Sequence, residues 1–208
     1  MIAYIVCAAP GGWIPEYIAN DILVIGVDRG ALKLIEAGIL PDVAIGDFDS
    51  VTDEHRQLIK QKSREFIQLN AEKDETDAKA AVDYAISAGA TDLRLFCALG
   101  GRMDHNQGAL ALMLYCAKCG VDISSEDEKN RLRVFRPSCK RILTTHQYVS
   151  FFALEGIVKN LIISDVKYPL DGYELHTDDS LCVSNEPLRG SVLLSFDEGY
   201  LLVITSDD

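Results

Sequence analysis

Asp47 and Asp49 are the residues whose type and spacing most directly indicate chemistry in this chain. They belong to the segment Gly46-Asp47-Phe48-Asp49-Ser50, which follows the apolar residues 43–45. The apolar run predicts a buried parallel strand, and the carboxylates then lie in a loop at its carboxyl end, where α/β sheets bind ligands. Such oxygen ligands suit Mg²⁺, which binds one or two carboxylates together with substrate phosphates. A plain turn or a helix N-cap is the alternative interpretation.

Three other polar clusters occur between a predicted strand and a predicted helix. They are Asp28-Arg29-Gly30, the pair Asp74 and Asp77, and Gly100-Gly101-Arg102-Met103-Asp104-His105. The repeated succession of strand, turn and helix predicts a parallel sheet with helices on both faces. Because the carboxyl ends of parallel strands share one edge, we expect all four clusters to meet at one rim.

The pair Asp74 and Asp77 precedes a helix predicted over residues 78–88. Asp74 is a suitable N-cap with Asp77 at the N3 position, so capping alone is one interpretation. Carboxylates at i and i+3 also share a helix face, and a helix N-terminus favours anionic ligands. Extra carboxylates at this place therefore suggest a cation between them.

Composition excludes several classes of partner. Among 208 residues, acidic side chains exceed basic ones by 12 (32 − 20), which argues against nucleic acid or an anionic membrane surface as a partner. No apolar run reaches the roughly 18 residues of a membrane span, and residues 1–9 lack the features of a signal peptide. We therefore expect a cytoplasmic protein whose six cysteines are reduced, including Cys116 and Cys119, which lack a second pair for zinc.

The character of the sequence changes after Gly120. Short β-rich runs follow, at residues 121–124, 131–135, 148–153, 158–163, 191–196 and 200–205. They predict an antiparallel sandwich or barrel after the α/β domain, and we expect an all-β sandwich. The expected domains are residues 1–122 and 123–208.

The polar rim is best suited to metal-dependent phosphoryl or nucleotidyl transfer. The chain contains neither a P-loop motif nor a G-x-S-x-G elbow. A metal ion would neutralise phosphate oxygens, and Arg102 would stabilise charge on the transferred group. Two alternatives stay open, namely another Asp-x-Asp phosphotransferase or phosphohydrolase, and a sensor that binds a nucleotide or the second substrate without turnover.

The joined motifs resemble the thiamin pyrophosphokinase family over nearly the whole chain. The resemblance lies in the order and spacing of seven segments. They are Gly26 to Gly30, Gly46 to Ser50, Lys73 to Asp77, Gly100 to His105, Lys167-Tyr168-Pro169-Leu170, Ser184-Asn185-Glu186 and Phe196 to Ile204.

The resemblance implies that ATP is the co-substrate and that its pyrophosphoryl group passes to the hydroxyl of thiamin, giving thiamin diphosphate and AMP. It implies that Asp47, Asp49 and Asp77 hold Mg²⁺, with Asp74 close by. Residues implied to contact ATP or its phosphates are Asp28, Arg29, Gly30, Thr76, Gly100, Gly101, Arg102, Asp104 and His105. Tyr168, Ser184 and Asn185 are implied to bind thiamin, together with Asp77. A homodimer is implied as well, with thiamin between the α/β domain of one chain and the β domain of the other.

Two positions depart from the family's usual pattern. Ala109 stands where Asn is frequent, and Pro187 stands where Phe is frequent. The first change removes one possible nucleotide contact, and the second alters the expected thiamin wall. Neither removes a candidate metal ligand. Asp77 and Asp104 both remain candidates for accepting the hydroxyl proton.

Overall fold

A computed structural model describes residues 1–10, 12–16, 18–72 and 74–208. Gly11, in the predicted turn after the first strand, and Lys73, in one of the motifs, lie outside the described residues. The chain divides into two compact units, Met1–Glu128 and Lys129–Asp208. Within the part of the chain that is described, no helix is long and apolar enough to cross a membrane.

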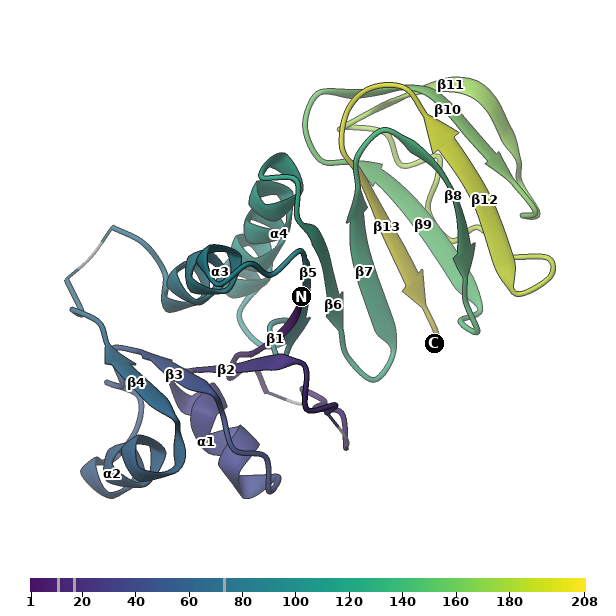
Figure 1. The fold of residues 1–208 in the computed structure, drawn as a ribbon. Coiled ribbons are helices and arrows are strands. Elements are labelled where there is room, and N and C mark those ends of the chain that lie inside the picture. Colours follow the sequence, from purple (N-terminus) through teal and green to yellow (C-terminus); the bar gives the residue numbers. More distant parts are fainter. Residues whose placement is uncertain (11, 17, 73) are drawn as a thin grey trace. The chain divides into compact units, whose positions relative to one another are not determined.

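The first unit is built on six parallel strands in the order β4-β3-β2-β1-β5-β6 (Figure 1). Their bounds are Ile2–Val6 (β1), Leu23–Val27 (β2), Val43–Gly46 (β3), Glu65–Gln68 (β4), Asp92–Phe96 (β5) and Asp122–Glu126 (β6). The central strands are short apolar runs, as expected for strands covered on both faces. The chain moves from β1 to β4 in one direction and then returns to place β5 on the other side of β1.

Helices cover both faces of this sheet. They are α1 (Arg29–Glu36), α2 (Asp53–Lys62), α3 (Asp77–Ser87) and α4 (Met103–Lys118). In Figure 1, α1 and α2 lie on one face, and α3 and α4 lie on the other. Right-handed crossovers that run in opposite directions along a sheet place their helices on opposite faces. The α/β class predicted from the sequence is therefore confirmed.

Two local features of this unit differ from the sequence-based interpretation. Helix α3 begins at Asp77 with Thr76 as its N-cap, whose side chain accepts a hydrogen bond from the backbone N–H of Lys79. Asp74, the other candidate cap, lies outside the helix. Thr76 has the β-region backbone that an N-cap residue needs, and it takes this position instead. The run predicted at residues 121–124 forms β6, which pairs in parallel with β5. Helix α4 carries the chain from the carboxyl end of β5 back to the edge where the parallel strands begin, so β6 can run parallel to β5.

The second unit is a sandwich of two antiparallel sheets (Figure 1). One layer consists of β7-β13-β9, three consecutive strands of a nine-stranded order, and the other is a four-stranded sheet with the order β11-β10-β12-β8. Their bounds are Asn130–Phe135 (β7), Ser138–Leu143 (β8), Tyr148–Ala153 (β9), Ile157–Ser164 (β10), Leu170–His176 (β11), Ser191–Phe196 (β12) and Leu201–Ser206 (β13). Apolar residues from both sheets form a common core that includes Phe151, Leu161 and Leu194. The predicted sandwich is confirmed.

Candidate active site

The loop after β3 is anchored by the residue between its two carboxylates. Phe48 is fully buried and stacks on Phe66 of β4, with ring centroids 4.6 Å apart. Its backbone has a positive φ of 58°, and its carbonyl oxygen accepts a hydrogen bond from Arg56 at 3.2 Å. Burial of the ring turns the neighbouring Asp47 and Asp49 away from the core. The apolar residue of this motif therefore fixes the loop that carries the acids.

Asp28 ties the end of β2 to this loop. Its Oδ1 accepts a hydrogen bond from the backbone N–H of Phe48 at 3.0 Å. The residue precedes α1 but makes no side-chain cap bond, and its φ of 48° is unusual for a residue other than glycine. A Cβ at position 46 would lie 1.9 Å from Asp28 Oδ1, so only glycine fits there. The hydrogen bond to the Asp28 carboxylate therefore joins the two loops, and the absence of a side chain at Gly46 lets them approach this closely.

Asp77 brings a third carboxylate to the same place. It is the first residue of α3, and this helix packs on β1, β2 and β3. Carboxylate oxygens of Asp28, Asp47 and Asp77 lie within 4.8 Å of one another. Oxygens on opposite sides of a Mg²⁺ ion are about 4.2 Å apart, twice the Mg–O distance of about 2.1 Å. The group is therefore of the right size and chemistry for a hard divalent cation.

The electrostatics of this group also favour a cation. Burial, above all, raises the pKa of Asp28 from 3.8 to about 6. The carboxylates of Asp77, Asp47 and Asp49 raise it further, while the hydrogen bond from Phe48 N–H opposes the change. Crowded anions of this kind are stabilised by a divalent ion, which is the largest local charge wherever it binds.

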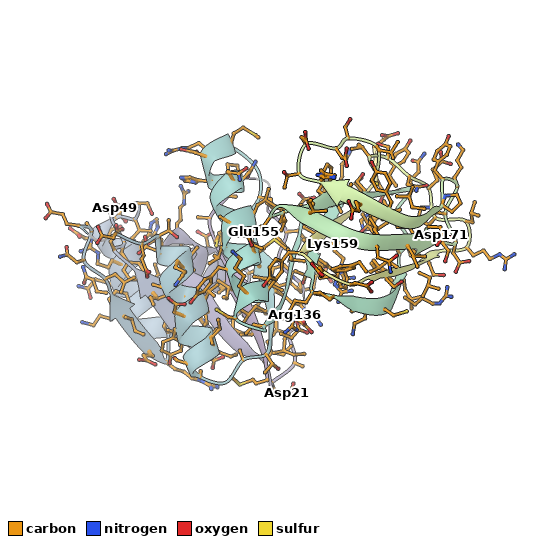
Figure 2. The ribbon with its side chains drawn as sticks, turned by 90° about the horizontal axis from the view of Figure 1, so that it is seen from above. Asp21, Asp49, Arg136, Glu155, Lys159 and Asp171 are labelled. Atoms are coloured by element: carbon orange, nitrogen blue, oxygen red, sulfur yellow. The ribbon has the colours of Figure 1, made fainter. Side chains whose placement is uncertain are left out.

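Asp49 and Asp74 lie outside this group of three. Both are exposed, and Asp49 is at the outer surface of its unit (Figure 2). The backbone N–H of Asp49 donates to Asp47 Oδ1 at 3.0 Å, which closes a tight local turn. The structure thus brings Asp47 and Asp77 together as expected and adds Asp28 in the place where Asp49 was expected.

The loop between β5 and α4 carries the predicted phosphate-binding residues. Gly100 and Gly101 have φ values of 104° and 72°, and a Cβ on either would come within 3.1 Å of Pro10. The two glycines therefore let this loop approach the loop after β1. The order of the strands reverses between β1 and β5, and such a switch point is where open α/β sheets bind ligands. Asn106 Oδ1 accepts a hydrogen bond from Gly100 N–H at 2.9 Å and fixes the loop.

Arg102 and Asp104 form an exposed ion pair on this loop. Arg102 Nε donates to Asp104 Oδ1 at 3.1 Å, and the side chains are 71% and 62% exposed. The hydrogen bond to Arg102 lowers the pKa of Asp104, which makes this carboxylate a weaker base while the pair persists. His105 is exposed, with its backbone N–H bonded to Asp104.

Arg29, Gly30 and Thr76 were predicted to contact the nucleotide. Arg29 is exposed. Gly30 is buried, and a Cβ there would lie 2.0 Å from the carbonyl oxygen of Val6, so the position serves the packing of α1 on β1. Thr76 caps α3. Their contacts with a nucleotide stay predictions.

Three of the predicted thiamin-binding residues, Tyr168, Ser184 and Asn185, belong to the second unit, whereas Asp77 belongs to the first. Asn185 is 5% exposed, and its Oδ1 accepts hydrogen bonds from the backbone N–H groups of Tyr168 and Glu186. Its Nδ2 donates to the carbonyl oxygen of Tyr168 at 2.8 Å. The side chain thus joins the loop at Tyr168 to the loop at Glu186. Tyr168 and Ser184 lie beside it and are exposed. Its first role is to position these neighbours, and direct contact with thiamin stays a prediction.

Two residues of the site were missed or misplaced by sequence reasoning. Asp28 was not expected in the carboxylate group, and its place at the end of β2, beside β3, was the available signal. Its contact with a nucleotide stays a prediction. Asn106 was not singled out although it fixes the glycine loop, and its position three residues into α4 was the only hint.

The fold and the site together define an α/β protein that gathers carboxylates and glycine loops at the carboxyl rim of a parallel sheet and carries a β-sandwich after it. Comparisons with known proteins narrow this class. Residues 14–124 match the catalytic domain of thiamin pyrophosphokinase, and residues 138–201 match its vitamin B1 binding domain. The chain therefore belongs to the thiamin pyrophosphokinase family.

Relatives of known structure agree with this placement. The chain is 34% identical to the thiamine pyrophosphokinase of Bacillus subtilis (strain 168) over 209 residues, which is 98% of both chains. A crystal structure of the Bacillus subtilis protein superimposes with a TM-score of 0.92, at 33% identity and full coverage of both chains. The thiamin pyrophosphokinase of Geobacillus thermodenitrificans gives a TM-score of 0.87 at 35% identity, covering 100% of this chain and 98% of that one. The family resemblance seen in the motifs is confirmed.

Proposed function

We propose that the protein transfers the pyrophosphoryl group of ATP to the hydroxyl of thiamin, producing thiamin diphosphate and AMP. The observation that carries this proposal is the meeting of Asp28, Asp47 and Asp77 at the carboxyl rim of the sheet. Membership of the thiamin pyrophosphokinase family supports the choice of substrates.

The proposed metal is Mg²⁺, held by Asp47 and Asp77 with Asp28 beside them. When bound, it would neutralise the phosphate oxygens of ATP. Asp49 and Asp74 are proposed to lie near the phosphates once a nucleotide draws their exposed loops inward. The short distances within the carboxylate group and the raised pKa of Asp28 support this assignment.

The chain's own residues account for the other requirements of the reaction. Backbone N–H groups of the loop at Gly100 and Gly101 are proposed to bind phosphate oxygens. Arg102 leaves the carboxylate of Asp104 and binds the pyrophosphoryl group that is being transferred. There it stabilises the charge that develops. Release from Arg102 makes Asp104 a stronger base, so Asp104 can then accept the thiamin proton, as Asp77 also can. Such transfer depends mainly on positioning and charge neutralisation.

Thiamin is proposed to bind beside Tyr168 and Ser184 in a homodimer whose two chains share each site. Large apolar side chains are exposed around Asn185, and a partner chain would cover them. They are Tyr168 (60% exposed), Leu181 (65%), Val183 (45%) and Leu188 (63%). A cytoplasmic location is proposed as well, and six free cysteines are compatible with it.

The activity is tested by incubating the protein with ATP, Mg²⁺ and thiamin and identifying the products. We expect AMP and thiamin diphosphate in equal amounts, and loss of both with a chelator or with Asp47→Asn. Formation of ADP or inorganic phosphate would indicate another phosphotransferase or a phosphohydrolase. Binding of substrates without any product would indicate a sensor.

The shared site is tested by mixing two inactive variants, Asp47→Asn and Ser184→Arg. The second changes an exposed side chain and therefore spares the core. If each site uses one residue from each chain, random exchange of chains should restore about a quarter of the wild-type rate, because half of the dimers then carry one intact site. No recovery after demonstrated exchange would contradict the shared site.

A further inference from the structure

The second unit contains a cavity of about 410 Å³ that the proposed reaction does not use. Ten residues line it, namely Arg131, Arg133, Ile142, Leu143, Thr144, Thr145, His146, Gly190, Val203 and Thr205. Its volume falls within the range of small-molecule sites, roughly 300–1,000 Å³.

The cavity forms where the core of the sandwich ends. Strand β7 pairs with β13 so that Phe135 lies opposite Leu201, Arg133 opposite Val203, and Arg131 opposite Thr205. Residues directly opposite in an antiparallel pair project to the same face of the sheet. Phe135 and Leu201 are part of the sandwich core, so the two arginines continue this inward face toward the open end. Arginine thus stands where a sandwich strand usually carries an apolar residue.

The chemistry of the lining differs from that of the chain as a whole. The protein has a formal charge of −12, yet no Asp or Glu is among the residues that line this cavity. Two guanidinium groups stand beside three threonines, one of which, Thr205, is only 4% exposed, while His146 Nδ1 lies 3.2 Å from Asp207 Oδ2 outside the lining. Guanidinium groups match phosphate oxygens in geometry and charge.

The floor of the cavity is apolar. Ile142 and Val203 are 5% and 2% exposed and belong to the sandwich core. A small inorganic anion alone would leave this floor uncovered. An apolar floor under a cationic wall is suited to a compound with an anionic group and an organic part.

The cavity is also separate from the predicted thiamin-binding residues. Asn185 pairs with Val149 of β9, and β9 is separated from β7 by β13 in the order β7-β13-β9. The central strand β13 therefore stands between the two arginines and the strand that carries the Asn185 contact. The cavity is a second place in this unit and not an extension of the first.

We propose that this cavity binds the phosphate group of a small phosphorylated compound. Arg131 and Arg133 contact the phosphate oxygens, Thr144 and Thr205 add hydroxyl hydrogen bonds, and Ile142 and Val203 lie under the organic part. The ligand can be an organic phosphate or free phosphate, which share this chemistry. Arg133 also lies 5.4 Å from the ring of Phe135, which holds its guanidinium against the sheet.

The test is a calorimetric titration of the intact protein in buffer without Mg²⁺, with inorganic phosphate, pyrophosphate, AMP and thiamin diphosphate as probes. Removing the metal weakens binding of phosphates at the carboxylate rim. Amide chemical shifts recorded at saturation locate the bound compound. We expect saturable binding, with the largest shifts in residues 131–133 and 144–146. Tighter binding of AMP or thiamin diphosphate than of phosphate would identify an organic phosphate as the ligand, and the reverse order would identify free phosphate.

Two variants and two controls complete the experiment. Arg133→Gln should weaken binding roughly ten- to a hundredfold, as expected for loss of a charged hydrogen-bond donor. Thr145→Trp should block the mouth of the cavity from an exposed position and spare the core if Arg133→Gln fails to fold. Arg141 pairs with Asp165 and does not line the cavity, so Arg141→Gln should leave binding unchanged. Asp47→Asn should do the same.

Three results would overturn the proposal. The first is the absence of binding by any probe at about 10 mM, a concentration that detects even millimolar affinity. The second is unchanged affinity in both Arg133→Gln and Thr145→Trp. The third is shifts confined to the loop at Gly100 and Gly101, because binding would then belong to the catalytic rim.

Discussion

Replacement of Gly46 by alanine should disable the carboxylate group without touching any of its acids. The added Cβ would lie 1.9 Å from Asp28 Oδ1 and 2.6 Å from Asp28 Cγ. Ordinary carbon–oxygen contacts begin at about 3.3 Å, so the carboxylate must move by about 1.4 Å. That movement breaks its 3.0 Å hydrogen bond from Phe48 N–H. Loss of a charged hydrogen bond costs about 1.5–3 kcal/mol of unfolding free energy.

The effect on catalysis should exceed the effect on stability. A misplacement of about 1 Å in a positioned group can cost about a hundredfold in rate. We therefore expect AMP formation to fall at least a hundredfold in Gly46→Ala under conditions where denaturant unfolding shows the protein still folded. Mg²⁺ affinity, measured by calorimetry, should fall with it.

Gly108→Ala is the matched control, because a Cβ at that position of α4 meets nothing within 4 Å. This variant should keep its rate and gain up to about 1 kcal/mol of stability from the higher helix propensity of alanine. If Gly46→Ala retained both wild-type turnover and wild-type Mg²⁺ affinity, the placement of Asp28 in the metal group would be refuted.

Three further predictions concern single side chains. Because the pKa of Asp28 is raised from 3.8 to about 6, the native state keeps a proton there that the unfolded chain has lost. Metal-free protein should therefore lose stability through this group as the pH rises from about 4 to about 7, and Asp28→Asn should remove that part of the slope in urea titrations. An identical slope in the variant would contradict the assignment. Thr76→Ala removes the cap of α3 and should cost about 1 kcal/mol of unfolding free energy, whereas a wild-type melting temperature would show that another group caps the helix. Asn185→Ala removes three hydrogen bonds from a buried side chain and should cost about 2–4 kcal/mol. Asn185→Asp should also destabilise, because it keeps both acceptor bonds but turns a buried carboxylate oxygen toward the carbonyl oxygen of Tyr168. A wild-type free energy of unfolding in Asn185→Ala would show that these bonds contribute little.

The parts of the fold that the sequence predicted well are those with one dominant signal. Apolar runs such as residues 43–45 are buried on both faces of the sheet and leave little choice but a central strand. Polar residues placed after such strands had to meet at the carboxyl rim, because parallel strands end at one edge. Asp47 and Asp77 lie together for this reason.

The missed strands lacked that signal. β8 has the sequence SCKRIL, and β11 has LDGYELH, each with most of its side chains exposed. Their pairing with β12 and β10 defines them as strands, and pairing across the chain is not visible in a local pattern. The same limit applies to the cap of α3, where Asp74 and Thr76 are both suitable residues and only the backbone conformation decides between them.

The position of Asp49 depended on a local detail of the loop. An Asp-x-Asp spacing allows both carboxylates to converge, but burial of Phe48 and the bond from Asp49 N–H to Asp47 Oδ1 turn the second acid outward. The left-handed backbone of Asp28, which brings its carboxylate into the group, was equally invisible because no residue type requires it there.

The order of strands in the second unit has a consequence for protein synthesis. Strand β13 pairs with both β7 and β9 and so lies between them, although it leaves the ribosome after both. Until it arrives, β7 and β9 have no partner between them, and their edges are exposed to other chains. A nonsense mutation or a stalled ribosome ahead of residue 201 would therefore yield a product that chaperones and proteases must handle, even though the preceding parallel sheet can already form.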